Sequence, residues 1–256
     1  MTAELPNFSA SRFHLYRTCP RLYRYQYIDG LPGNTHVYTV MGSALHAAIE
    51  QHYKHEKNPA GVFSTRFNEG INEAMDRSAL VGVGLVSKAA ALGQGIIAGI
   101  QWWTLKPSMI EVGFSFPFPT HNPMVQMRGF IDMITEEEYI IDHKSGSKKP
   151  TALELAHNPQ LLIYCWAYRL TTGRLPKKVF WHHLRTHELV EAKVLDGFED
   201  KLAKLEADLT QILSDREYAK IERGYFCDSL CAHKELCWPD TYGNSTYGAG
   251  DITRLW

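Results

Sequence analysis

Two short segments carry side chains whose types and spacing could support chemistry. Residues 139–144 read Tyr-Ile-Ile-Asp-His-Lys, an apolar run that ends in an acid and a base. Side chains alternate across a strand, so Asp142 and Lys144 would share one face and His143 would take the other. Upstream, Asp132 lies in a second alternating run, residues 127–134. These residues form the first candidate site.

The two runs are separated by three glutamates, residues 136–138. If these glutamates form the loop of a hairpin, Thr135 pairs with Tyr139, and the same register places Asp132 opposite Asp142. Two facing carboxylates repel, and a divalent cation between their oxygens is the simplest way to offset the repulsion. Taken alone, an Asp-x-Lys pattern is more often a solvated salt bridge than a site.

A helix is expected over residues 40–56, with Gly42, His46 and Glu50 on one face. The glycine would allow close backbone approach, and His46 could then reach into a site. A lone histidine on a helix is more often packed or exposed than a ligand, so this interpretation depends on its neighbours.

Gln160 and Tyr164 lie four residues apart in a helix that Asn158 would cap, so they share a face near its N-terminus. Free backbone N–H groups at that end favour anions. Glu111 lies in an alternating run and is interpreted as a surface residue rather than as a further acid of the site.

The composition limits the class of protein. The chain has 256 residues, 45% of them hydrophobic, and a formal charge of -1. It has no run of about 18 apolar residues and no signal-peptide pattern, so we expect a soluble cytoplasmic protein, bacterial, archaeal or phage-encoded, with no membrane partner. The balanced charge gives no bulk attraction to a polyanion, so any binding of nucleic acid must be local.

Basic and aromatic residues are interspersed near the N-terminus, a composition that suits phosphate contact and base stacking. An amphipathic helix with Tyr and Arg stems packed on the body is an equally good interpretation. The candidate nucleic-acid contacts are Arg12, Arg21, Arg24, Tyr23 and Arg128.

The periodicity predicts an α/β fold in one domain, residues 1–239. A mixed sheet over residues 108–144 and 177–194 would be flanked by helices, including one that Asp196 and Glu199 would cap. Residues 240–256, rich in Gly, Tyr, Asn and Ser, are expected to be a flexible tail.

Five cysteines are unevenly spaced. Cys227, Cys231 and Cys237 form a C-x3-C-x5-C run, and Cys19 stands alone in Thr-Cys-Pro. An odd count argues against a disulfide framework, and clustered thiols indicate a metal or a cluster. Cys165, between Tyr and Trp, is expected to be a buried apolar thiol.

The order of these motifs resembles the RecB-type branch of the PD-(D/E)XK nuclease superfamily. The likeness is closest to its iron-sulfur members, which include CRISPR-associated exonucleases and AddB-type nuclease domains. It spans residues 11–239 and depends on five elements in order: Gly42-x3-His46, Gly129-x2-Asp132, Asp142-x-Lys144, Gln160-x3-Tyr164 and the cysteines. It implies a restriction-endonuclease-like core, with an N-terminal helix and the late cysteine run (Cys19 and residues 225–239) joined by a cluster.

The resemblance also implies roles. Mg²⁺ or Mn²⁺ would be held by His46, Asp132, Asp142 and the backbone carbonyl of His143, and Lys144 would position or activate the attacking water. The remaining catalytic residues, Gln160 and Tyr164, would orient the DNA end. A [4Fe-4S] cluster would be bound by Cys19, Cys227, Cys231 and Cys237. Four thiolates also suit tetrahedral Zn²⁺, which is the alternative.

The implied function is a DNA exonuclease that cleaves single-stranded or frayed ends, 5′ to 3′ as in similar proteins, in recombination, repair or phage and CRISPR DNA processing. Endonuclease activity would be compatible with the same site, as would a recombinase, helicase or integration complex as partner. A second hypothesis is a DNA-end-binding adaptor that cleaves little. A third is a nuclease directed at RNA, because no feature of the sequence reads a 2′-hydroxyl.

Overall fold

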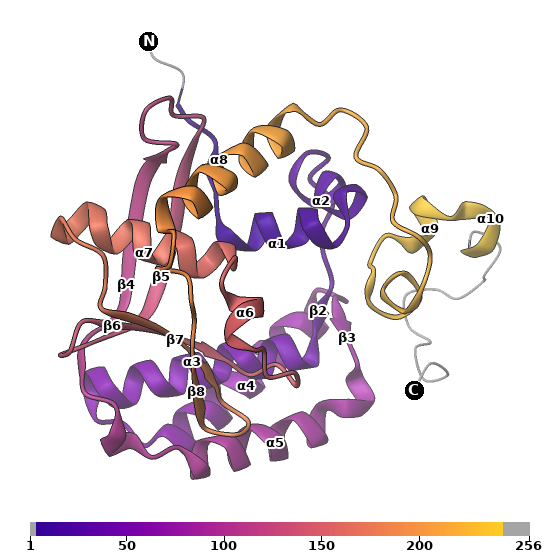
Figure 1. The fold of residues 1–256 in the computed structure, drawn as a ribbon. Coiled ribbons are helices and arrows are strands. Elements are labelled where there is room, and N and C mark those ends of the chain that lie inside the picture. The colour runs from indigo at the N-terminus through magenta and orange to yellow at the C-terminus, as the bar shows by residue number, and fades with distance from the viewer. Residues whose placement is uncertain (1–3, 243–256) are drawn as a thin grey trace. The chain divides into compact units, whose positions relative to one another are not determined.

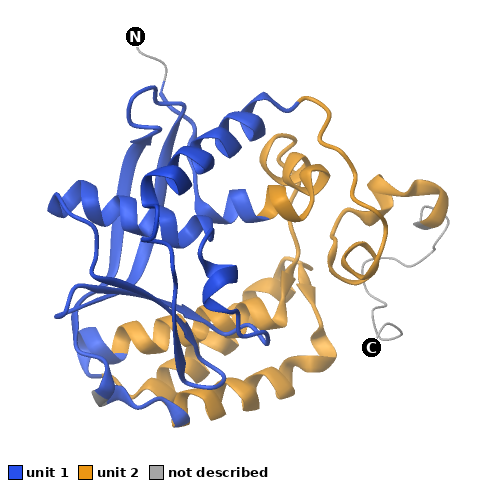
Figure 2. Cartoon of the chain, in the orientation of Figure 1, with its two compact units in different colours: residues 1–14, 52–56, 99–215 blue, residues 15–51, 57–98, 216–256 orange. Residues whose placement is uncertain are grey.

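The computed structural model describes residues 4–242. The chain divides into two compact units, each built from separated segments (Figure 2). The first unit takes residues 1–14, 52–56 and 99–215, and the second takes residues 15–51, 57–98 and 216–256. The assignment of residues 1–239 to a single nuclease domain stays a prediction.

The first unit is organised around a six-stranded sheet with the order β1-β5-β6-β7-β8, in which β4 also pairs with β5. The β1–β5 and β6–β7 pairs are parallel and the others antiparallel, which confirms the mixed sheet predicted from the sequence. The strands are β1 (Asn7–Phe8), β4 (Pro107–Phe118), β5 (Val125–Thr135), β6 (Tyr139–Lys144), β7 (Lys178–His183) and β8 (Glu188–Glu191).

Three helices of the first unit alternate with its strands: α6 (Ala152–Leu155) and α7 (Pro159–Thr172) lie between β6 and β7 in the chain, and α8 (Phe198–Ser214) comes after β8 (Figure 1). Helix α7 contacts both β6 and α8. Thr151 and Glu154 form the expected capping box of α6, and Asn158 caps α7. The N-cap of α8 is Gly197, which makes no side-chain cap, so the cap expected from Asp196 does not form there.

The second unit is mainly helical and carries the three late cysteines together with Cys19. Its helix α2 begins directly after Cys19, because Pro20 fits the first helical position but cannot continue the preceding helix α1. The first residues of α1 and the last residues of α3 and α5 belong to the first unit. The helices are α1 (Ala10–Thr18), α2 (Pro20–Tyr27), α3 (Val37–His55), α4 (Pro59–Asp76), α5 (Val86–Gly99), α9 (Lys234–Cys237) and α10 (Pro239–Tyr242).

Short elements complete the description. Strands β2 (Thr35–His36) and β3 (Leu80–Val81) pair in parallel in the second unit, and single turns η1, η2 and η3 lie at Val83–Leu85, Trp102–Thr104 and Phe226–Leu230. Helix α10 includes the first residues of the predicted tail, whereas residues 243–256 lie outside the described part. Within residues 4–242, no helix combines the length and apolar character needed to cross a bilayer.

Candidate functional site

The candidate site lies where the sheet of the first unit divides. One edge of β5 pairs with β1 at Gln126 and Met127 and with β6 at Met133 and Ile134, and residues 128–132 lie between these two ladders. We call this gap the strand fork. Beyond it, β6 continues beside β7. A gap of this kind leaves backbone groups of β5 and β6 without the ladder partners that a continuous hairpin would supply.

Asp132 lies at the inner end of the strand fork. The ladder pairs Met133 with Ile141 and Ile134 with Ile140, which confirms the hairpin register that the three-glutamate loop predicts. Asp132 and Asp142 are the next residues beyond the last pair of this ladder. The Oδ2 atom of Asp132 accepts the backbone N–H of His143 at 2.7 Å. Burial raises the pKa of Asp132 to about 6, although Lys144 and the His143 amide act in the opposite direction.

Asp142 and Lys144 share a face, as strand alternation predicts. The Lys144 ammonium donates to Oδ1 of Asp142 at 2.6 Å. The Asp142 side chain is 0% exposed and that of Lys144 is 26% exposed, so the carboxylate is inside and the amine reaches the surface. A charged hydrogen bond of this length is stronger than a neutral one and fixes the geometry of both groups.

Glu111, which the sequence interpretation assigned to the surface, lies beside Asp132 and is a candidate site residue. Its neighbours Ile110 and Val112 pair with Met133 and Ile131, so Glu111 lies across from Asp132 on β4. Carboxylate oxygens of Glu111 and Asp132 lie within 4.8 Å of each other. Glu111 has a φ of +51°, which is unusual for a residue with a side chain and is found where a strand is locally distorted. Alternation alone could not reveal this distortion.

Three adjacent strands therefore each carry a carboxylate near the strand fork: Glu111 on β4 lies across from Asp132 on β5, and Asp142 on β6 follows the last β5–β6 pair. Carboxylate oxygens are the ligands that Mg²⁺, and to a large extent Mn²⁺, prefer. The donor set of the first unit therefore fits a hard divalent cation.

Gln160 and Tyr164 form the pair that helical spacing predicts, and Nε2 of Gln160 donates to the Tyr164 hydroxyl at 2.6 Å. The pKa of Tyr164 is raised, first by burial and then by the charges of Asp142, Asp132 and Glu111. The negative charges of the three carboxylates disfavour ionisation of the phenol, so the Tyr164 hydroxyl remains protonated.

The absence of a side chain at Gly129 leaves room for the Phe114 ring, which packs against Tyr164. A Cβ atom at Gly129 would lie 2.6 Å from the ring of Phe114, its partner on β4. The Phe114 ring makes an edge contact with Tyr164, with centroids 6.0 Å apart. A side chain at position 129 would displace Phe114 and remove support from Tyr164.

The turn between β7 and β8 holds the segment that follows Lys144. The amide of Leu184 donates to the Lys144 carbonyl at 2.9 Å, and Nε of Arg185 donates to the Ser145 carbonyl at 2.7 Å. These bonds fix the end of β6 and so limit the positions open to the Lys144 backbone.

His143 points to the opposite side of β6, where its Nδ1 lies 2.9 Å from Nδ1 of His182. Burial lowers the pKa of His182 to about 4, so that ring is neutral at pH 7. The role of the His143 carbonyl as a metal ligand stays a prediction, and so does that of His46, which is half-buried on α3 in the second unit.

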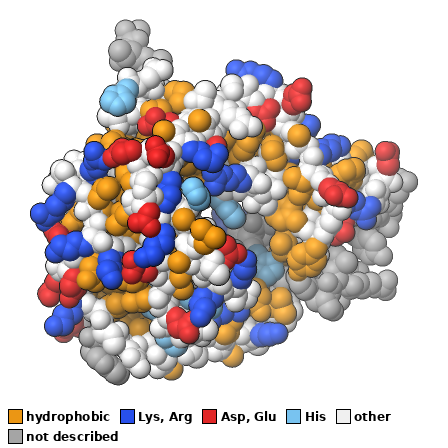
Figure 3. All heavy atoms as spheres, in the orientation of Figure 1, with side chains coloured by type: hydrophobic (Ala, Val, Ile, Leu, Met, Phe, Trp, Pro, Cys, Tyr) orange, Lys and Arg blue, Asp and Glu red, His pale blue; other side chains and the backbone are white. Residues whose placement is uncertain are grey.

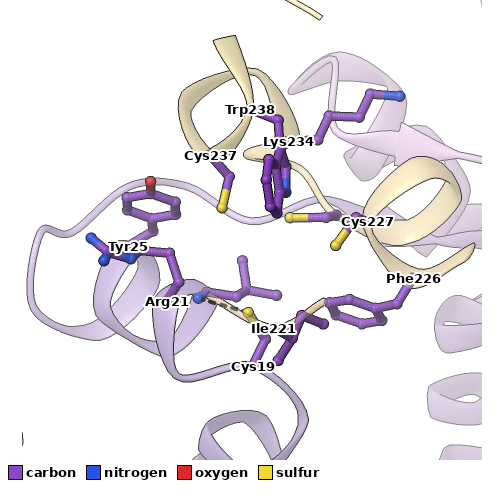
Figure 4. A pocket seen from close by; sticks show the side chains of 11 residues that line it. Cys19, Arg21, Tyr25, Ile221, Phe226, Cys227, Lys234, Cys237 and Trp238 are labelled. Carbon is purple, nitrogen blue, oxygen red and sulfur yellow. Dashed lines mark hydrogen bonds between the residues drawn. The ribbon is translucent and has the colours of Figure 1, made fainter. Parts of the chain in front are cut away.

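Four cysteines of the second unit line a pocket, which we call the cysteine pocket. Figure 4 shows the sulfur atoms of Cys19, Cys227 and Cys237 around it. Cys19 caps α2, with its Sγ accepting the Leu22 amide at 3.4 Å. All four thiols are free, and the lining residues are Cys19, Arg21, Leu22, Tyr25, Ile221, Phe226, Cys227, Cys231, Lys234, Cys237 and Trp238.

Burial, the other thiols and nearby cations act on the ionisation of the cysteines in this pocket. Burial raises the pKa of Cys231, and the other three thiols of the set raise it further. Burial also raises the pKa of Cys237, whereas Lys220 and Arg21 lower it. Mutually close sulfurs that resist ionisation alone become thiolates when a metal binds, so this donor set fits either zinc or an iron-sulfur cluster. Cys165 is fully buried elsewhere, and burial raises its pKa, as expected for an apolar thiol.

The candidate nucleic-acid contacts are dispersed. Tyr23 is only 3% exposed and packs against Tyr218, so its buried ring is not available to stack on a base, and we correct that prediction. Arg21 lines the cysteine pocket, and Arg24 pairs with Asp29 at 3.3 Å.

Arg12 lies over the Phe8 ring at 5.7 Å, and Arg128 is exposed on β5. Figure 3 shows basic and acidic side chains interspersed on the face that it draws. Charge alone therefore does not mark a nucleic-acid surface on that face, and the roles of Arg12 and Arg128 stay predictions.

Comparison with known proteins was consistent with this geometry. The sequence profile of the PD-(D/E)XK nuclease superfamily matches residues 7–238. A crystal structure of a protein from Eubacterium rectale, provisionally named an exonuclease, covers 80% of this chain and 79% of its own, with 14% identity and a TM-score of 0.55. At this identity the match supports the fold alone.

A second crystal structure, of SSO0001, covers 88% of this chain and 94% of its own. Its identity is 12% and its TM-score 0.34, which is too low to support an argument. No curated protein matches the sequence significantly.

Proposed function

The chain belongs to the PD-(D/E)XK nuclease superfamily, and on this premise we propose that it is a metal-dependent exonuclease acting on DNA. The proposed substrate is a single-stranded or frayed end, degraded from 5′ to 3′. The observation that carries the proposal is the strand fork, where Asp132 and Asp142 follow the last β5–β6 pair and the Lys144 ammonium contacts Asp142 at 2.6 Å.

The proposed cation site uses Asp132 and Asp142, with His46 and the His143 carbonyl as further ligands. We add Glu111 to this set because its carboxylate oxygen lies within 4.8 Å of one on Asp132. A divalent cation supplies positive charge that polarises the phosphodiester and lowers the pKa of water. Mg²⁺ and Mn²⁺ both suit the carboxylates, and an imidazole ligand would favour Mn²⁺.

The chain's own groups have separate tasks in this proposal. The Lys144 ammonium is fixed by Asp142 and is partly exposed, so it can hold the attacking water and stabilise negative charge as it develops on phosphorus. The Tyr164 hydroxyl stays protonated, because its pKa is raised, and can donate a hydrogen bond to the DNA end. Gln160 orients that hydroxyl.

The proposed occupant of the cysteine pocket is a [4Fe-4S] cluster, with zinc as the alternative. Support comes from the four free cysteines that line one pocket. Such a site would join residue 19 to residues 227–237 and would stabilise the fold by closing a long loop.

Two alternative functions remain as hypotheses: a DNA-end-binding adaptor in a recombination or spacer-capture complex, and a nuclease that prefers RNA. The proposal is tested with DNA and RNA oligonucleotides labelled at either end, digested with Mn²⁺ or Mg²⁺ and with a chelator. We expect metal-dependent release of short products from the 5′ end of single-stranded DNA. Faster digestion of RNA would support the RNA hypothesis, and tight end binding without any product would support the adaptor.

A further inference from the structure

An indole side chain lies beside the amine of the proposed active site. Trp181 on β7 pairs in register with Asp142 on β6, so the two side chains are neighbours on one face of the sheet. The Lys144 ammonium lies 5.4 Å from the centre of the Trp181 ring. The same nitrogen is 2.6 Å from Oδ1 of Asp142.

These contacts hold the ammonium from two directions. A lysine side chain has four rotatable bonds and loses substantial entropy when it is fixed in one place. The carboxylate of Asp142 fixes the distance, and the negative face of the indole attracts the cation from the side. Because Lys144 is only partly exposed, this attraction is screened less than at an open surface.

The burial of the indole nitrogen agrees with a Trp181 ring whose face is turned toward Lys144. The Nε1 atom of Trp181 is buried, and within residues 4–242 it has no hydrogen-bond partner. The polar edge of the ring is therefore directed inward, while the ring face contacts Lys144.

We propose that Trp181 is a positioning residue that keeps the Lys144 ammonium at Asp142 and so raises the rate of the chemical step. The inference rests on the proposed nuclease function and assigns to that site a residue outside the motifs of the sequence. It requires that the effect of Trp181 be expressed through Lys144 rather than through contact with DNA.

The chain offers a matched control. Trp166 on α7 is also half-buried, its Nε1 is also buried without a partner in the described residues, and the guanidinium of Arg169 lies 5.4 Å from its ring centre. Its cation, however, is Arg169, which bonds to Glu199 rather than to a carboxylate of the strand fork. Substitution of Trp166 therefore reproduces the loss of an indole and of a cation contact without touching Lys144.

The kinetic test compares Trp181→Leu, Trp181→Phe and Trp166→Leu with the wild type on single-stranded DNA and Mn²⁺. We expect Trp181→Leu to lower kcat about 5- to 30-fold with little change in KM, because a partly buried cation-π contact has an effect of this order. Trp181→Phe, which keeps an aromatic face, should recover most of the activity, and Trp166→Leu should leave kcat unchanged. Thermal unfolding of each variant shows whether it is folded.

The contact itself can be measured without turnover. In protein labelled at lysine, the ε-methylene protons of Lys144, assigned with Lys144→Arg, should be shifted upfield by the indole ring current. Trp181→Leu should remove this shift and Trp166→Leu should leave it in place.

Two results would overturn the inference: an unchanged Lys144 shift in Trp181→Leu, or an unchanged kcat. If kcat is unchanged while KM and the DNA dissociation constant in Ca²⁺ rise, Trp181 is a DNA contact. A wild type without nuclease activity would overturn the proposed function instead, and the NMR shift would still decide whether Trp181 holds Lys144.

Discussion

The carboxylate of Asp132 accepts the backbone N–H of His143 at 2.7 Å, although β5 and β6 no longer pair at that level. In a continuous hairpin this N–H would bond to a main-chain carbonyl of β5. The carboxylate takes over that role at the strand fork. One side chain thus satisfies the backbone where the strands diverge and also lies with a carboxylate oxygen within 4.8 Å of one on Glu111.

This dual role predicts how stability depends on pH. The pKa of Asp132 is about 6 in the folded protein, against an ordinary value of 3.8, so the folded state binds the proton more tightly. Stability should therefore fall as pH rises from about 4 to 6, by about 3 kcal/mol for a shift of this size. Asp132→Asn keeps an acceptor for His143 and removes the charge.

Urea unfolding without metal should test this expectation. At pH 7 Asp132→Asn should be more stable than the wild type, and the difference should vanish near pH 4. Added Mn²⁺ should stabilise the wild type and not the variant. A variant less stable than the wild type at pH 7 would show that the Asp132 carboxylate is not penalised by burial.

Lys144→Ala should abolish most cleavage, because it removes the ammonium held at Asp142. We expect a loss of at least about 100-fold in kcat, as for other groups that stabilise charge in a transition state. Affinity for Mn²⁺, measured by calorimetry, should persist. The control is Lys148→Ala, which removes an exposed lysine bonded to Glu154. Equal activity of both variants would remove Lys144 from the mechanism.

Glu111→Gln should weaken binding of the divalent cation, since it removes the carboxylate that lies within 4.8 Å of Asp132. A loss of about 10-fold or more in Mn²⁺ affinity is expected, with normal folding by circular dichroism. Glu136→Gln, in the hairpin loop, is the matched control. Unchanged affinity in Glu111→Gln would return Glu111 to the surface role that the sequence suggested.

Cys231→Ala should remove the visible absorbance of anaerobically purified protein and lower its melting temperature, because three thiolates hold a cluster less well than four. Cys165→Ala, at a buried thiol away from the cysteine pocket, should keep the colour and the metal content. A colourless wild type with one zinc per chain would replace the cluster with the zinc alternative.

The hairpin register was predictable because it depends on the number of residues in the loop. Three loop residues between two alternating runs determine which residues face each other, and the pairing of Met133 with Ile141 follows from that count. The helix start at Asn158 was equally clear, since Asn and Pro are favoured there for local reasons.

The rest depended on tertiary structure. Glu111 lies across from Asp132 and itself has a positive φ. This local distortion of β4 cannot be seen in the alternation of its side chains. The buried position of Tyr23 results from packing against Tyr218, nearly two hundred residues away in the sequence. The approach of Trp181 to Lys144 follows from the parallel pairing of β6 with β7, which neither strand specifies alone.

The most direct measurement compares the wild type with Asp142→Ala for cleavage of end-labelled single-stranded DNA in Mn²⁺, with DNA affinity measured in parallel in Ca²⁺. We predict metal-dependent cleavage by the wild type, at least about 100-fold less by the variant, and similar DNA affinity for both. Equal cleavage by the two proteins, or binding by both with no product from either, would contradict the assignment of a catalytic cation to the strand fork.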